Sequence, residues 1–306
     1  MKKVLISAAC ALSVSKLINI FNMENDRMRI TGSDIKKCLN AHKSNFIVLP
    51  YCLDHEDLYI AKLDELLENF DYFYPHSDEE LLVIIRNKKN LKNFKKIVLS
   101  TYEAIITCSD KGNLQEFLVA NDIPTPISSN SNANKIIKPR LGRGCKNIIK
   151  TDNQEIINFF LSTQQENFLV TDFINGSEFS VDAVFDVEHN NLLDFIIRKR
   201  VSFQSVSNSS ETFLIDSFIE IIEKISKKLF FTGPVNFQFI LGEDRVPYLI
   251  EINPRLSGSM VFSYLSGLNP FEPNLSDGHM KYRKNKNYKF TSESFYAKWE
   301  IMKIED

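Results

Sequence analysis

The chain has 306 residues, of which 43% are hydrophobic, so it can build one large domain or two to three ordinary ones around buried cores. This composition excludes a disordered or fibrous protein. The 37 basic and 39 acidic residues leave a formal net charge of -2, which gives no overall field for holding nucleic acid. No stretch reaches the roughly 18 apolar residues that a membrane helix needs. We therefore expect a soluble protein with no nucleic-acid partner and no membrane partner.

The first ten residues carry some features of an export signal. Met1-Lys2-Lys3 is basic, and an apolar run and small residues follow it before Cys10. That run is shorter than the roughly 7–15 residues of a signal core, so a buried first strand over Val4–Ser7 is favoured. The five cysteines include no CxxC pair, and the five histidines include no HExxH. We therefore expect a cytoplasmic protein without disulfides or bound zinc.

The first hundred residues alternate short β-type runs with amphipathic stretches. The β-type runs include 46–49 and 96–99, and helical periodicity covers 59–70 and 79–91. Such alternation predicts an open, largely parallel sheet covered by helices. No GxGxxG follows the first strand, which disfavours a dinucleotide site of the Rossmann type.

The rest of the chain predicts a mixture of helices and strands. Ser109 and Asp110 are suited to cap a short helix, which the prolines at 124 and 126 end. A second helix is predicted over 215–229, where isoleucine, phenylalanine and leucine recur at helical spacing. A polar tract covers 281–289, and 295–304 is typical of an edge strand. The predicted strands are 135–138, 168–173, 179–185, 192–197, 235–241 and 246–252.

The last two of these strands carry the first candidate site, because the glycine and charged residues between them predict a β-hairpin. Alternation puts Gln238 on the face opposite the large apolar side chains, and it puts Glu251 and Asn253 on one face of the return strand. With the turn centred between residues 244 and 245, Gln238 lies opposite Glu251. Such oxygen ligands suit Mg²⁺, and Arg255 adds a cation for phosphate oxygens. A solvated polar face of an edge hairpin is the alternative.

A glycine loop with several cations forms the second candidate site. Lys138 ends a predicted strand, and Arg140, Gly142 and Gly144 follow it. Glycines let backbone N–H groups approach a polyphosphate, and lysine neutralises its charge. The loop is not a Walker A motif, since GxxxxGK[ST] is absent. An ordinary basic turn between strands is the alternative.

A glycine-containing connection between two strands forms the third candidate site. The backbone of Asp172, Phe173 and Ile174 is placed to hydrogen-bond adenine, and Glu178 to hydrogen-bond ribose hydroxyls. Taken alone, a turn with solvated acids explains the same residues. Farther on, Arg198-Lys199-Arg200 ends a predicted strand and is a candidate for gripping a substrate carboxylate or the transferred phosphate, with solvated charges as the alternative.

In this order, the elements resemble the ATP-grasp superfamily, specifically the branch similar to the large subunit of carbamoyl-phosphate synthetase and related carboxylate-amine ligases. The resemblance covers most of the chain, and its most specific part is the hairpin with Gln238 and Glu251. It implies an α/β plus α+β fold, in which an N-terminal open α/β (pre-ATP-grasp) domain over 1–107 precedes a two-subdomain ATP-grasp fold. The small subdomain would cover 108–175, and the large subdomain with its C-terminal tail 176–306.

The resemblance also implies roles for individual residues. Gln238, Glu251 and Asn253 would hold the metal, and the catalytic candidates are Lys138, Arg200 and Arg255, the last of which would steady the transferred phosphoryl group. Gln238 stands in place of a carboxylate, which lowers the local negative charge and favours one metal ion over two, and the number of ions stays open. The residues expected to bind the nucleotide are Lys111, Lys138, Arg140, Gly142, Gly144, Asp172, Phe173, Ile174, Glu178 and Gln238.

The activity implied by this resemblance is an ADP-forming ligase that depends on ATP and on Mg²⁺, with Mn²⁺ as the other metal. A substrate carboxylate would attack the γ-phosphate of ATP, and an amine or a thiol would capture the acyl phosphate. The expected partners are a small-molecule carboxylate and an amine, and a homodimer is left open. Two alternatives stay open: a small-molecule phosphotransferase without ligation, and a nucleotide-binding subunit without catalysis.

Overall fold

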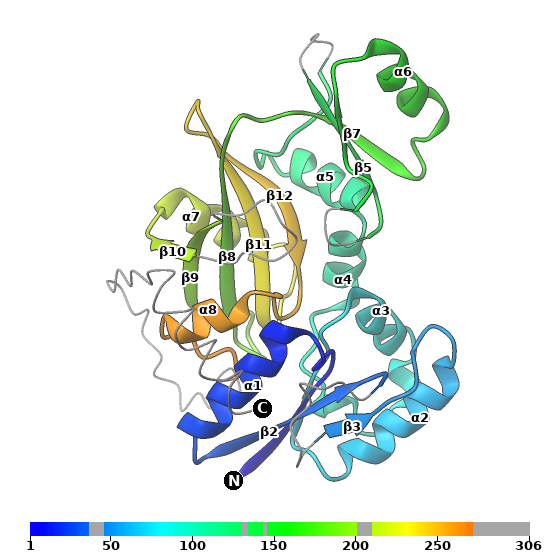
Figure 1. Ribbon diagram of the computed structural model, residues 1–306, viewed down its shortest axis with the longest axis vertical. Coiled ribbons are helices and arrows are strands. Elements are labelled where there is room, and N and C mark those ends of the chain that lie inside the picture. The colour runs from blue at the N-terminus through cyan, green and yellow to red at the C-terminus, as the bar shows by residue number, and fades with distance from the viewer. Residues whose placement is uncertain (37–45, 130–133, 143–145, 201–209, 272–306) are drawn as a thin grey trace.

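The computed structural model describes residues 1–36, 46–129, 134–142, 146–200 and 210–271. Within them, a four-stranded parallel sheet is followed along the chain by a three-stranded and then a five-stranded antiparallel sheet. Figure 1 shows the parallel sheet at one end of the molecule, the large sheet beside it and the small sheet at the other end. This succession confirms the predicted α/β plus α+β class.

The N-terminal sheet has the strand order β3-β2-β1-β4, and helices cover both of its faces. Its elements are β1 (Lys2–Ile6), α1 (Leu12–Glu24), β2 (Met28–Asp34), β3 (Phe46–Val48), α2 (Glu56–Leu67), β4 (Tyr72–Tyr74) and α3 (Asp78–Arg86). Val4, Leu5 and Ile6 in β1 are all fully buried, as is typical of a central parallel strand. Val4 and Ile6 belong to the core that α1 covers, and Leu5 belongs to the core beneath α2 and α3.

Short helical elements connect this sheet to the rest of the chain. They are two 3-10 turns, η1 (Lys88–Asn90) and η2 (Phe94–Lys96), and the helices α4 (Tyr102–Ser109) and α5 (Lys111–Ala120). Asp110 caps α5, since its carboxylate accepts hydrogen bonds from the backbone N–H groups of Gly112 at 2.7 Å and Asn113 at 3.2 Å. The cap fixes where α5 begins, and with it the position of Lys111.

The small sheet has the strand order β6-β5-β7, and one helix covers it. Its elements are β5 (Lys135–Pro139), β6 (Ile149–Thr151), α6 (Gln154–Thr163) and β7 (Phe168–Asp172). Ile137, Ile157 and Val170 form its buried core, with Phe160 and Phe168 packed against them. This core is separate from the others, so the small sheet is held mainly by its own helix.

The large sheet has the strand order β10-β9-β8-β11-β12. Its elements are β8 (Gly176–Phe185), β9 (Leu192–Arg200), β10 (Ser210–Phe213), α7 (Asp216–Ser226), β11 (Gly233–Gly242), β12 (Pro247–Asn253) and α8 (Met260–Leu265). One face packs on α7, where the rings of Phe218 and Phe239 stack with centroids 4.3 Å apart. The other face carries buried polar side chains such as Asp182 and Asn236, and also Val184, which packs in the core beneath α8.

A β-bulge interrupts the pairing of β11 with β12. Phe239 pairs with Leu249 whereas Gln238 pairs with Glu251, so Ile250 is the extra residue. Leu249 and Ile252 are both buried in the core, at 0% and 1% exposure. The two residues between them, Ile250 and Glu251, therefore both point away from that core, which strict alternation would not allow.

Most of the predicted elements are present, with shifted ends. The predicted helices 59–70, 79–91 and 215–229 correspond to α2, α3 and α7. The strand predicted over 96–99 is wrong, because residue 96 ends η2 and Ile97 makes only an isolated bridge to Phe73. The prediction missed α1, α4, α6 and α8, and β2, β4, β6 and β10.

Other predictions meet the structure only in part. The proposed domain boundary after residue 107 falls inside α4, and the one after 175 falls where β8 begins. The polar tract 281–289 and the edge strand 295–304 lie outside the described residues. Cys52 and Cys108 are free and buried, but Cys10 is disulfide-bonded, so the expectation of a chain without disulfides is wrong there. In the described part of the chain, no helix has the length and apolar content that crossing a bilayer requires.

We predict that Phe239→Ala lowers the free energy of unfolding by about 3–5 kcal/mol, because it leaves a cavity beside Phe218 in the main core. Urea unfolding followed by circular dichroism measures the change. Phe159→Ala is the matched control: Phe159 lies on α6 and is 53% exposed, so its loss costs about 1 kcal/mol or less. Equal shifts in the two variants would contradict this account of the core.

Candidate functional site

A cavity of about 520 Å³ lies between the small and the large sheet. Its walls come from strands of both sheets, from the connection between β7 and β8, and from the first residue of α5. The structure brings ten of the predicted site residues to this cavity: Lys111, Lys138, Gly142, Asp172, Phe173, Ile174, Glu178, Arg200, Gln238 and Glu251. Gly144 lies outside the described residues, and Arg140, Asn253 and Arg255 do not line the cavity.

Two of the three predicted metal ligands lie side by side at this cavity. Gln238 pairs directly with Glu251 across the β11–β12 ladder, as predicted from the hairpin. Asn253 lies two residues farther along β12, where it pairs with Asn236. Its side chain is 8% exposed and accepts a hydrogen bond at 3.0 Å from Nη2 of Arg255. Among the described residues, no group of three or more His, Cys, Asp and Glu side chains gathers to hold a metal. A cation here would therefore be coordinated by one carboxylate and by amide oxygens.

Lys111 connects the glycine loop after β5 to the hairpin formed by β11 and β12. Its backbone N–H donates to the carbonyl of Arg140 at 3.0 Å, and its Nζ donates to the carbonyl of Gly142 at 2.8 Å. The same Nζ lies 3.9 Å from Oε1 of Glu251. One ammonium group thus joins the glycine loop to the only carboxylate of the predicted metal site.

Lys138 projects from the end of β5 into the same cavity. Burial lowers the pKa of its ammonium group to about 8, since removal from water disfavours the charged form. The nearby Glu251 carboxylate raises that pKa and the Lys111 ammonium lowers it. An incoming anion would favour the protonated form, so binding of an anion and protonation of Lys138 are coupled.

Arg140 does not point into the cavity, although we predicted it as a nucleotide contact. Its Nε donates to Asp110 at 2.9 Å and its Nη2 donates to Asn113 at 3.0 Å, so the guanidinium lies over the start of α5. A Cβ at Gly112 would come within 2.4 Å of the guanidinium carbon, which explains the glycine there. The contacts of Arg140 anchor β5 on α5 and thereby hold Lys111 beside Lys138.

The connection between β7 and β8 forms the apolar end of the cavity. The Asp172 side chain is held by Lys135 and Ser129, and although burial would raise its pKa, these hydrogen bonds outweigh burial and lower it. Phe173 is 38% exposed, and Nζ of Lys150 sits 3.4 Å from the centre of its ring. Asp172 is therefore pinned by its own neighbours, whereas Phe173 and the following Ile174 face the cavity.

Arg200 lies between two of the predicted site residues. Its Nη1 donates to Oε1 of Gln238 at 3.0 Å and lies 3.6 Å from Oε2 of Glu178. A guanidinium therefore contacts both the predicted metal ligand and the predicted ribose contact. Any ligand that uses these two oxygens has to replace the contacts of Arg200.

Arg255 joins the end of the hairpin to the N-terminal part of the chain. Its Nε and Nη2 donate to the two carboxylate oxygens of Asp78, the first residue of α3, at 2.7 and 2.9 Å. Its Nη1 donates to the carbonyl of Leu256 at 3.2 Å. In this structure Arg255 is thus a link between two parts of the fold, and its predicted contact with a phosphoryl group stays a prediction.

The sequence analysis missed Asp182, which lies in the middle of β8. It is 0% exposed and accepts a hydrogen bond at 2.8 Å from Nδ2 of Asn236. The signal was present, because a carboxylate in the apolar run from 179 to 185 is unusual for a buried strand. Ile136, Ile240 and Ile250 also line the cavity, and nothing in their residue type marks them as site residues.

Comparison with known proteins gives three kinds of match. Residues 164–294 match the family model described as ATP-grasp in the biosynthetic pathway with Ter operon. The carbamoyl phosphate synthase large chain of Thermoanaerobacter pseudethanolicus is 28% identical in an alignment of 232 positions that covers 61% of this chain. The match spans only 22% of the length of that relative.

Solved structures share the fold at low sequence identity. An L-amino acid ligase from Bacillus licheniformis has a TM-score of 0.63 at 16% identity, covering 86% of this chain and 69% of that one. An N5-carboxyaminoimidazole synthetase from Staphylococcus aureus has a TM-score of 0.65 at 17% identity, covering 86% and 72%. Both matches take in the N-terminal sheet as well as the later antiparallel sheets, since each covers most of the chain. The chain thus shares its fold with these two enzymes, matches an ATP-grasp family model over residues 164–294, and has distant similarity to the carbamoyl phosphate synthase large chain.

Proposed function

We propose that the chain is an ATP- and Mg²⁺-dependent ligase that joins a small-molecule carboxylate to an amine or a thiol, with an acyl phosphate as the intermediate. The observation that carries the proposal is the cavity between the two sheets. There, Lys111 and Lys138 face the oxygen ligands Gln238 and Glu251. Lysines beside a carboxylate and an amide are the groups that a metal-bound polyphosphate needs.

The nucleotide would lie along the cavity with its base toward the connection between β7 and β8. Phe173 and Ile174 offer backbone groups and apolar surface for adenine, and Glu178 offers a carboxylate for the ribose hydroxyls. Lys111, Lys138 and the backbone at Gly142 would then meet the phosphates. Arg140 takes no part in this placement, because its side chain is bonded to α5.

The donor set fits a divalent cation that prefers oxygen. Gln238 and Glu251 would hold it, with Asn253 next in line on β12, and the same oxygens suit Mn²⁺. When bound, the ion would neutralise phosphate charge and orient the γ-phosphoryl group. The guanidinium of Arg200 sits on Oε1 of Gln238 and would leave it when the cation binds. The released Arg200 is then available to a substrate carboxylate or to the transferred phosphoryl group.

The reaction would run in two steps. A carboxylate oxygen of the substrate attacks the γ-phosphorus of ATP, the bond to the β-phosphate oxygen breaks, and ADP leaves. An amine then attacks the carbonyl carbon of the acyl phosphate, loses a proton and releases inorganic phosphate. Lys111 and Lys138 would stabilise negative charge in the first step, so positioning and charge neutralisation suffice without a histidine base.

The substrates are open within this proposal. The similarity in fold to an L-amino acid ligase favours amino acids as the first compounds to test. The phosphotransferase remains the second candidate, because the same cavity would serve transfer to an alcohol. A homodimer stays an expectation from the sequence.

We predict that the full chain releases ADP from MgATP in a screen of amino acids and small carboxylates paired with amines, and that hydroxylamine traps a hydroxamate. Glu251→Gln should lower the rate about 100-fold or more, because it removes the carboxylate from the cation site. Glu220→Gln, the same change at an exposed position on α7, should leave the rate unchanged. ADP release with a stable phosphorylated alcohol would favour the phosphotransferase, and no turnover with any pair would contradict the ligase.

A second prediction concerns protons taken up on binding. Because the pKa of Lys138 is about 8, its side-chain amine is mostly neutral at pH 8.5 when no ligand is bound. It becomes protonated when phosphate oxygens approach. We expect binding of MgADP to take up about 0.8 of a proton at pH 8.5 and close to none at pH 6.5. Calorimetry in two buffers of different ionisation enthalpy measures this uptake.

Lys138→Arg is the control for this experiment, since a guanidinium stays charged throughout the range. The variant should bind MgADP without proton uptake at either pH. Uptake that persists in Lys138→Arg would assign the proton to another group.

A further inference from the structure

A line of buried polar side chains runs through the large sheet to Gln238. Asp182 in β8 and Asn236 in β11 are paired residues of neighbouring strands, and they are 0% and 2% exposed. Gln238 follows two positions along β11 on the same face. Hydrogen bonds connect Asp182 to Asn236 and Asn236 to Gln238, and of these three residues only Gln238 lines the cavity.

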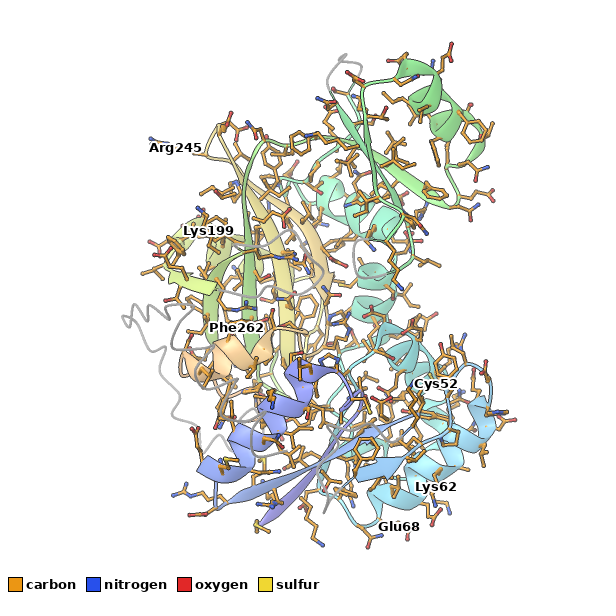
Figure 2. The ribbon with its side chains drawn as sticks, viewed as in Figure 1. Cys52, Lys62, Glu68, Lys199, Arg245 and Phe262 are labelled. Atoms are coloured by element: carbon orange, nitrogen blue, oxygen red, sulfur yellow. The ribbon has the colours of Figure 1, made fainter. Side chains whose placement is uncertain are left out.

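The inner end of this line is held firmly. Oδ2 of Asp182 accepts hydrogen bonds from Nη2 of Arg198 at 2.6 Å and from Oγ of Ser263 at 2.5 Å. Arg198 is itself fully buried, donates to Ser259 on the N-terminal side of α8, and lies 5.9 Å from the ring of Phe262, which Figure 2 labels on that helix. Because both donors use Oδ2, the other oxygen of Asp182 is left for Asn236.

The chemistry of Asp182 fixes the orientation of two amides. A carboxylate that is bonded to a guanidinium accepts hydrogen bonds, so Asn236 has to turn its NH₂ group toward Oδ1, which lies at 2.8 Å. Oδ1 of Asn236 then faces the other way and accepts from Nε2 of Gln238 at 3.4 Å. Gln238 is left with its oxygen toward the cavity, where Nη1 of Arg200 donates to it at 3.0 Å.

We propose that Asp182 is a positioning residue, which acts through Asn236 to present the oxygen, and not the NH₂ group, of Gln238 to the divalent cation. The inference rests on the proposed function of the same cavity. The amide of a glutamine has nearly the same shape in either orientation, but only its oxygen binds a metal. A glutamate at this position would present an oxygen either way and would need no such control.

That difference between glutamine and glutamate supplies the test. Asn236→Leu is made in the native chain and in the Gln238→Glu background, and binding of Mn²⁺ is titrated by electron paramagnetic resonance in the presence of ADP. In the native background we expect Mn²⁺ to bind about 10-fold more weakly, the scale found when a partner of a metal ligand is lost. In the Gln238→Glu background the same substitution should change affinity less than about two-fold.

Two controls separate positioning from general damage to the fold. Thermal unfolding should shift equally in both backgrounds, because the donor to Asp182 is lost in each. Asn22→Leu makes the same chemical change on α1, where Asn22 bonds to Ile30 far from the cavity, and should leave Mn²⁺ affinity unchanged. If Asn236→Leu does not fold, Asn236→Ala is used in the same cycle.

Each outcome bears on a separate claim. Equal weakening of Mn²⁺ binding in the two backgrounds, or no weakening in the native one, would overturn the positioning role while leaving the proposed function intact. Failure of the native chain itself to bind Mn²⁺ with ADP would overturn the proposed function, and with it the role of Asp182 at the cation.

Discussion

The antiparallel pairing of β11 with β12 is the interaction on which the site depends. Backbone hydrogen bonds set Gln238 against Glu251, and the burial of Phe239 and Ile252 on the other face decides which way the two strands turn. The bulge at Ile250 reconciles the two demands, because it lets Leu249 enter the core while Glu251 faces the cavity. Sheet packing and the placement of ligand oxygens are thus settled by the same few residues.

Charge balance is the second constraint. The cavity gathers Lys111, Lys138 and Arg200 around Glu251 and Glu178. Lys111 and Arg200 each contact an acidic or carbonyl oxygen before any ligand arrives, and Lys138 lies within the electrostatic influence of Glu251. Polar contacts within the protein reduce the cost of holding these charges in a partly dry space. Burial nevertheless lowers the pKa of Lys138, and the nearby carboxylate of Glu251 offsets only part of that shift.

The sequence was sufficient for the parts of the site that follow local rules. Alternation along the hairpin predicted the pairing of Gln238 with Glu251, and the strand end before a glycine loop predicted Lys138. Their register came out right although the turn is one residue tighter than predicted, because the bulge restores the pairing at Gln238.

Contacts between segments far apart in the chain could not be predicted from local sequence patterns. Arg140 and Arg255 have the same residue type as phosphate-binding arginines, but partners on α5 and at Asp78 take up their donors. Likewise α4 was missed, since its eight residues pack between two cores and show no clear periodicity. Only the folded chain reveals which cation is already paired.

The ion pair of Arg255 with Asp78 has a consequence for how the protein is made. The two residues are 177 positions apart, and Thr101 at the start of α4 likewise donates its backbone N–H to the carbonyl of Phe230, which lies just before β11. During synthesis the N-terminal sheet emerges before the hairpin, and these contacts form only once the hairpin has been made. Contacts of such long range slow folding. Until they form, Asp78 at the start of α3 lacks its arginine partner, and this side of the N-terminal part stays exposed to solvent.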